Sequence, residues 1–232
     1  MKPALPPRRS LPWRAQYRII PTLYPPVDLF ERTDLTERQK RAVFHAQRRI
    51  NPRLRQAAGG LDLVRRGDRV HGSNASVVMA PFAHLGYTTR FSDGSYGVYY
   101  AARTLETAIR ETVYHTEREA RIAGLAPQAF HRRVFIGKVS KAMYDVRAPQ
   151  YADLHQPDTY APSQAFARWL LSVDRDAWGI VYHSVRHPGG DCIAAFRPTA
   201  VSLPTQGPHL FYTWDGHKIT DVYEQTAPIL SF

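Results

Sequence analysis

Apolar side chains recur with the 3.6-residue period of an amphipathic helix in two segments of the chain. The first runs from residue 104 to about residue 123 and carries Leu105, Ala108, Ile109 and Thr112 on one face. The second follows Ser163, a residue type that caps helix N-termini, and its apolar face consists of Phe166, Trp169, Leu170 and Val173. Both segments are predicted to be helices that pack one face against a core.

Short apolar or alternating runs bounded by turn residues predict several strands around these helices. They cover residues 97–102 (GVYYAA), 133–140 (RVFIGKVS), 179–185 (GIVYHSV) and 192–196, and residues 210–214 and 217–223 form a hairpin that turns at Asp215-Gly216. Strands and helices do not alternate regularly enough for a doubly wound sheet or a barrel. The pattern therefore predicts a mixed α/β or α+β domain.

The first part of the chain has a different character. Residues 1–15 are dominated by Pro and Arg and are predicted to form a flexible basic arm, with order beginning near Tyr17. Asp34 and Thr36 are candidate caps of a basic amphipathic helix that Pro52 ends or kinks. We therefore expect a single domain over residues 16–232, which includes a basic helical insertion at about residues 30–70.

Charge and composition narrow the class of protein. The formal net charge is +11, and residues 1–55 alone hold 13 Lys or Arg against 4 Asp or Glu. The longest stretch without a charge, residues 70–89, is too polar for a bilayer span, and the prolines near the N-terminus do not fit a secretory signal. Cys192 is the single cysteine, which cannot form an internal disulfide. A cytoplasmic protein is expected.

Familiar motifs of cofactor and metal chemistry are absent from the sequence. It contains no Gly-x-Gly-x-x-Gly after a strand, no phosphate-binding P-loop, no His-Glu-x-x-His and no Gly-x-Ser-x-Gly. The histidines are scattered, and the close pair His183 and His187 flanks a turn instead of sharing a helix. We expect no metal site.

Residues 89–115 contain the most informative cluster. A turn brings Arg90, the following strand brings Tyr99 and Tyr100 on opposite faces, and the next helix brings Glu111 to the flank of its apolar face. A carboxylate there can be partly desolvated and can face a cleft formed with the strand. Each residue also has a structural alternative to a role in a site. Glu111 can be a surface glutamate, Tyr100 a core residue, and Arg90 an arginine that stabilises the turn.

A second cluster, residues 179–198, places Ser184 at the end of a strand and before Gly189-Gly190. Small residues at the end of a strand leave room for a ligand, and binding groups often occupy such positions in open sheets. A serine in this position can also bond only to the backbone, and no Asp and His pattern near it indicates a nucleophile.

Together these segments resemble the RES-domain family, which is named after a recurring arginine, glutamate and serine. The match consists of Arg90-Phe91, Tyr100 ten residues later, Glu111 eleven residues after that, and the late run Gly179-Ile180-x-Tyr182-x-Ser184 with its Gly-Gly pair. Tyr17-Arg18-Ile19 resembles the opening motif of the family. The 71 residues between Arg18 and Arg90 exceed the spacing in short members and contain the basic helix.

The resemblance implies an ADP-ribosyltransferase-like central β-sheet with flanking helices, here with an N-terminal helical extension. It also implies an NAD-degrading toxin of a toxin–antitoxin pair that cleaves the nicotinamide–ribose bond. Bond cleavage builds positive charge on the ribose, so a fixed carboxylate is needed, and Glu111 is the candidate. Arg90 and Arg18 suit the pyrophosphate. Tyr100 is expected to border the nicotinamide, and Ser184 to bond a ribose hydroxyl, the carboxamide or an attacking phosphate.

Other outcomes remain open at this stage. The same chemistry can hydrolyse NAD, phosphorolyse it or ADP-ribosylate a protein. An RNA-cleaving or nucleic-acid-binding toxin is the alternative from another class, but residues 38–55 interleave only Phe44 with their arginines, so direct binding of nucleic acid is not expected. The expected partners are NAD, as substrate and not as cofactor, and a cognate Xre-type antitoxin that docks on the basic segment. No membrane partner is expected.

Overall fold

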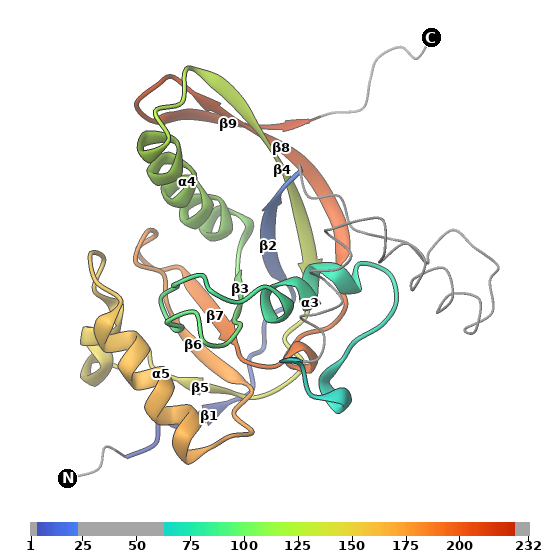
Figure 1. Ribbon diagram of the computed structural model, residues 1–232, viewed down its shortest axis with the longest axis vertical. Coiled ribbons are helices and arrows are strands. Elements are labelled where there is room, and N and C mark those ends of the chain that lie inside the picture. The colour runs from blue at the N-terminus through green and yellow to red at the C-terminus, as the bar shows by residue number, and fades with distance from the viewer. Residues whose placement is uncertain (1–3, 23–62, 226–232) are drawn as a thin grey trace, which may run out of the picture.

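The computed structural model describes residues 4–22 and 63–225, and these residues form an α+β fold (Figure 1). The strands are β1 (Arg8–Arg9), β2 (Gln16–Pro21), β3 (Tyr99–Ala102), β4 (Gln128–Gly137), β5 (Met143–Asp145), β6 (Gly179–His183), β7 (Asp191–Ala195), β8 (Thr205–Trp214) and β9 (Ile219–Gln225). The helices are α3 (Ala75–Ala83), α4 (Leu105–Ile122) and α5 (Ala161–Val173), with the short 3₁₀ helices η2 (Arg66–Asp68), η3 (Pro149–His155) and η4 (Pro198–Ala200).

All nine strands of the described residues belong to one sheet, in the order β1-β5-β6-β7-β3-β2-β4-β8-β9. The β5–β6 pair is parallel, and the other neighbouring pairs are antiparallel. The late strands β6 and β7 thus lie between β5 and the early strand β3. This order brings residues 179–195 next to residues 99–102.

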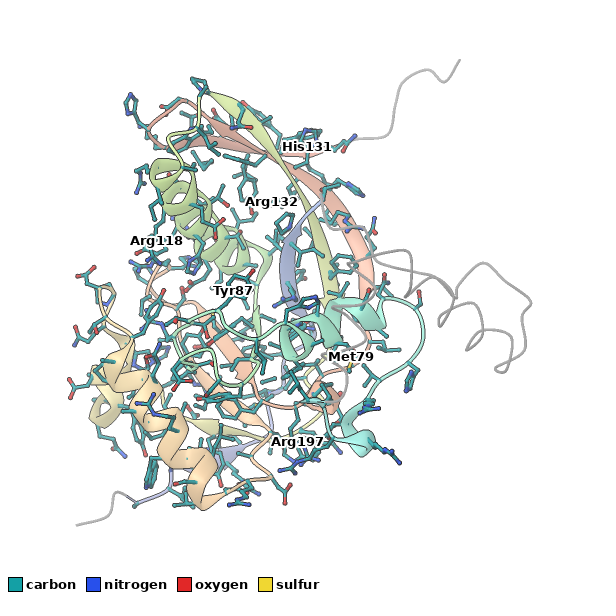
Figure 2. The ribbon with its side chains drawn as sticks, in the orientation of Figure 1. Met79, Tyr87, Arg118, His131, Arg132 and Arg197 are labelled. Atoms are coloured by element: carbon teal, nitrogen blue, oxygen red, sulfur yellow. The ribbon has the colours of Figure 1, made fainter. Side chains whose placement is uncertain are left out.

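Helices cover both faces of this sheet. On one face, Ala108 of α4 and Leu170 of α5 join a buried cluster with Ile180 and Tyr182 of β6. On the other face, α3 packs Val78, Met79 and Phe82 against Tyr99, Val181 and Ile193. Arg132, labelled in Figure 2, reaches from β4 to α4, where its Nη2 donates a hydrogen bond to Thr116 Oγ1 at 2.9 Å. The α+β prediction, a central sheet with flanking helices, is confirmed.

Most predicted elements are present, although β4 and β8 each begin five residues before the predicted strands. The helix predicted over residues 104–123 is α4, and Thr104 caps it, since its Oγ1 accepts a hydrogen bond from Thr107 N at 3.2 Å. Asp215 and Gly216 form the β8–β9 turn, in which Gly216 takes a φ of 101°. Ser163 is not the cap of α5, because the helix begins two residues earlier. The Ser163 hydroxyl instead donates to the carbonyl of Arg90 at 2.6 Å.

The front end differs from the prediction of a flexible arm. Arg8 and Arg9 pair with Tyr144 and Met143, so this segment adds a strand to the edge of the sheet. Arg8 also forms an ion pair with Asp174 and lies over the Tyr144 ring. These long-range contacts, and not the local composition, order residues 4–15.

The predicted basic helix and the candidate antitoxin-docking segment lie outside the described residues. The described end of the predicted insertion, residues 63–70, packs against the body of the fold. Its buried Asp68 accepts hydrogen bonds from Arg197 Nε and Nη2 and from Thr199 Oγ1. No helix within residues 4–22 and 63–225 has the length and apolar character needed to cross a membrane.

Candidate active site

Glu111 and Ser184, predicted from separate segments, are in direct contact. Glu111 is half-buried on α4, and Ser184 is 7% exposed just after β6. Ser184 Oγ donates a hydrogen bond to Glu111 Oε1 at 2.5 Å across 73 residues of sequence. A short hydrogen bond to a carboxylate is a charge-assisted bond, which fixes both side chains more strongly than a neutral pair.

The backbone after β6 sets the direction of the Ser184 hydroxyl. Ser184 Oγ accepts hydrogen bonds from Arg186 N at 3.2 Å and His187 N at 3.0 Å, while Ser184 N donates to Gly190 O at 2.8 Å. A hydroxyl has a single proton to donate. Because Oγ accepts from two backbone N–H groups, its proton is directed to Glu111. The alternative in which this serine bonds the backbone is therefore confirmed, and its binding of a ligand stays a prediction.

Tyr100 shares the sheet face of this pair. The strand β7 lies between β3 and β6. Along β3, Tyr100 pairs with Ala194 of β7 and Ala102 pairs with Cys192. Along β6, Tyr182 pairs with the same Cys192, so Tyr100 and Tyr182 lie on one face of the sheet. The Tyr100 hydroxyl accepts from Phe91 N at 2.9 Å and bonds Thr89 Oγ1 at 2.9 Å. Burial raises the pKa of Tyr100, so the phenol stays protonated. Its hydroxyl is thus used to hold the loop that carries Arg90.

Arg90 is 7% exposed and is held by backbone oxygens from a distant turn. Its Nη1 donates to Leu154 O at 3.2 Å and Gln156 O at 2.9 Å, and its guanidinium carbon lies 5.0 Å from the Tyr160 ring centroid. Within the described part of the chain, Arg90 Nε and Nη2 have no hydrogen-bond partner. These two nitrogens carry three N–H donors that the described residues leave unused.

The charges of Glu111 and Arg90 converge on the same two side chains. Burial raises the pKa of Tyr182 and of Cys192 well above their ordinary values, the negative charge of Glu111 adds to both increases, and the positive charge of Arg90 opposes them. Sequence reasoning did not include these two residues in the site. The signal was present in the alternation of β6 and β7, which places both on the face of Ser184.

The structure does not bring Arg18 together with this group. Arg18 Nη1 donates to Tyr100 O at 2.9 Å, but the guanidinium carbon lies 4.6 Å from the ring centroid of Tyr99, which packs on the opposite face of the sheet. Burial lowers the pKa of Arg18, and within the described residues its buried Nε has no hydrogen-bond partner. Arg18 therefore contacts β3, the strand that carries Tyr100, from the opposite face of the sheet.

Arg186 and Tyr114 form a further contact close to Ser184 in the chain. The guanidinium carbon of Arg186 lies 3.4 Å from the Tyr114 ring centroid, and its Nη2 donates to Pro157 O at 2.7 Å. Both residues also line a groove of about 550 Å³ between α4 and β9, whose lining does not include Glu111. Stacking thus joins the loop after Ser184 to the helix that carries Glu111.

Comparisons with known proteins place this geometry in a family. The family model for the RES domain matches residues 66–215, which include Arg90, Tyr100, Glu111 and Ser184. The chain is also 30% identical over 213 residues to the uncharacterized protein y4oC of Sinorhizobium fredii, an alignment that covers 89% of this chain and 86% of that protein. The chain therefore belongs to the RES-domain family, whose members are NAD-acting, toxin-like proteins with an ADP-ribosyltransferase-like fold.

Proposed function

We propose that this protein is the toxin half of a toxin–antitoxin pair and cleaves the nicotinamide–ribose bond of NAD. The observation that carries the proposal is the hydrogen bond from Ser184 Oγ to Glu111 Oε1, which fixes a carboxylate on the face that Tyr100 shares. Departure of nicotinamide leaves an oxocarbenium-like ribose, and a preorganised negative charge stabilises that transition state. Glu111 supplies this charge.

The other residues have binding roles in this proposal. Arg90 offers two donors to the NAD pyrophosphate, because a planar guanidinium can bind two phosphate oxygens at once. The Tyr100 ring borders the nicotinamide, while its hydroxyl holds the Arg90 loop. Ser184 orients Glu111 through its hydrogen bond to Oε1. A bond from Ser184 to the ribose or to an attacking phosphate would have to replace one of the three hydrogen bonds that the hydroxyl makes here. Arg18 supports β3 from the opposite face and is not assigned to NAD.

The choice of acceptor separates three versions of the reaction. Water gives free ADP-ribose, inorganic phosphate gives a phosphorylated ADP-ribose, and a protein side chain gives an ADP-ribosylated protein. All three use the same bond cleavage at the same carboxylate, so they share the proposed roles of Glu111 and Arg90. We favour release of a small product, by hydrolysis or phosphorolysis, with transfer to a protein as the second candidate.

The test is incubation of the purified full chain with NAD, with and without inorganic phosphate, followed by mass spectrometry of the products. Glu111→Gln keeps the side-chain volume but removes the charge, and kcat is expected to fall about 100- to 1,000-fold. Glu106→Gln is the matched control, because Glu106 lies on the same helix but is 60% exposed and paired with Arg110. Full turnover by a folded Glu111→Gln variant would overturn the assignment.

A further inference from the structure

A histidine outside the family motif joins the turn that holds Arg90 to the central sheet. His155 is the last residue of η3 and is half-buried. Its Nδ1 lies 3.0 Å from Tyr151 O, and His183 N, on β6, donates to its Nε2 at 3.1 Å. A carbonyl only accepts and a backbone N–H only donates, so the ring carries its proton on Nδ1 and presents a lone pair on Nε2. The cross-link therefore requires neutral imidazole.

The residues on either side of His155 are those that hold Arg90. Leu154 O and Gln156 O accept from the same Arg90 nitrogen, at 3.2 and 2.9 Å. The Arg90 carbonyl is fixed independently by Ser163 Oγ at 2.6 Å. The backbone of Arg90 is thus set by α5, whereas the direction of its guanidinium depends on the carbonyls that flank His155.

We infer that His155 is a positioning residue, which aims the Arg90 guanidinium at the NAD pyrophosphate by holding η3 against the backbone of β6. This inference rests on the proposed function. His155 does not touch the substrate in this scheme and acts only through the two carbonyls. Its loss is expected to weaken binding of NAD and to leave the chemical step at Glu111 nearly unchanged.

The surroundings of His155 favour the neutral ring. Partial burial lowers its pKa below 6.5, electrostatic interactions with His183 and Arg90 lower it further, and the hydrogen bond to Tyr151 O opposes this shift. Tyr182 faces it at 6.4 Å between ring centroids, and Asp191 bonds the Nδ1 of His183 at 3.0 Å. A proton added at Nε2 in acid would face the His183 N–H and break the cross-link.

The test compares His155→Phe, which removes both ring nitrogens, with His155→Gln, whose amide oxygen can still accept from His183 N. His84→Phe is the matched control, because His84 Nδ1 makes the same contact with a carbonyl four residues back, Ala80 O at 3.0 Å, but is exposed at the end of α3. We expect His155→Phe to raise the KM for NAD about tenfold with kcat within twofold. His155→Gln should restore part of the affinity, and His84→Phe should change neither constant.

Two further measurements separate positioning from a general loss of structure. In the Arg90→Lys background, His155→Phe should add less than a twofold change in KM, because the residue it positions is gone. The KM of the wild type should rise as the pH falls below 6.5, and His155→Gln should lose this dependence. Independent effects of the two substitutions, or a fall in kcat at constant KM, would overturn the inference.

Two measurements that need no enzymatic turnover test the role of His155 separately from the proposed function. ¹⁵N NMR of histidine-labelled protein at neutral pH should show His155 as the Nδ1-protonated tautomer. Hydrogen exchange at the His183 amide should accelerate in His155→Phe and less so in His155→Gln. Absence of nicotinamide release by the wild type would refute the proposed function, whereas an Nε2-protonated ring or an unchanged His183 amide would refute the cross-link itself.

Discussion

Substitution of Ser184 by alanine tests the central contact of the site most directly. The change removes the donor to Glu111 Oε1 at 2.5 Å and the acceptor of two backbone N–H groups. A hydrogen bond to a charged group contributes about 1.5–3 kcal/mol. If Ser184 holds Glu111 in its catalytic direction, most of that energy is lost from the transition state, and kcat should fall about 10- to 100-fold.

The assay is release of nicotinamide from NAD over a range of substrate concentrations, together with urea unfolding of each variant. The two lost backbone bonds should lower the free energy of unfolding by about 1–3 kcal/mol, which leaves a folded protein at 25 °C for a domain of ordinary stability. Ser172→Ala is the control, since among residues 4–22 and 63–225 that hydroxyl bonds only Trp169 O of its own helix. A folded Ser184→Ala variant with kcat within twofold of wild type would refute the reasoning.

Three other substitutions have defined outcomes. Arg90→Lys keeps the charge but cannot offer the N–H donors of Nε and Nη2 in their planar arrangement, so the KM for NAD should rise at least tenfold; wild-type kinetics would show that Arg90 serves only the turn. Tyr100→Phe removes the acceptor for Phe91 N and should lower the free energy of unfolding by about 1 kcal/mol with kcat within threefold, whereas a large fall in kcat would assign chemistry to the hydroxyl. Hydrogen bonds from Arg147 lower the pKa of Asp145 below 3.8, a stabilisation that is present above that value and is lost as the pH falls through the folded pKa. Urea unfolding should therefore show a smaller loss of stability between pH 7 and pH 3 in Asp145→Asn than in wild type, and equal losses would contradict this linkage.

The elements that sequence reasoning predicted are those with strong local signals. The helix α4 has a threonine cap and an apolar face at regular spacing, and the β8–β9 hairpin has an Asp-Gly turn between alternating strands. By contrast, α3 is apolar on most sides and contains Pro81, so periodicity did not mark it, although its N-cap is Asn74. The strand β1 is two residues long and exists because β5 offers it a free edge, which no local pattern reveals.

The site shows the same division between local and long-range information. Positions for Glu111 and Ser184 followed from the family motif, but their mutual contact depends on β7 pairing with both β3 and β6. The carbonyls that hold Arg90 lie 64 and 66 residues away and belong to backbone, so no residue type signalled them. Arg18 was assigned to the same site from its motif, and strand alternation at Tyr99 and Tyr100 separates it from that face.

The strand order has a consequence for the timing of synthesis. A ribosome completes β3 and α4 long before it reaches β6 and β7, the two strands that carry Ser184 to Glu111. Contacts between residues so distant in sequence form late, because most of the chain must be present before they can close. A nascent or prematurely truncated chain therefore holds the carboxylate without the serine that orients it. The Glu111–Ser184 pair therefore comes into existence only in a nearly finished protein.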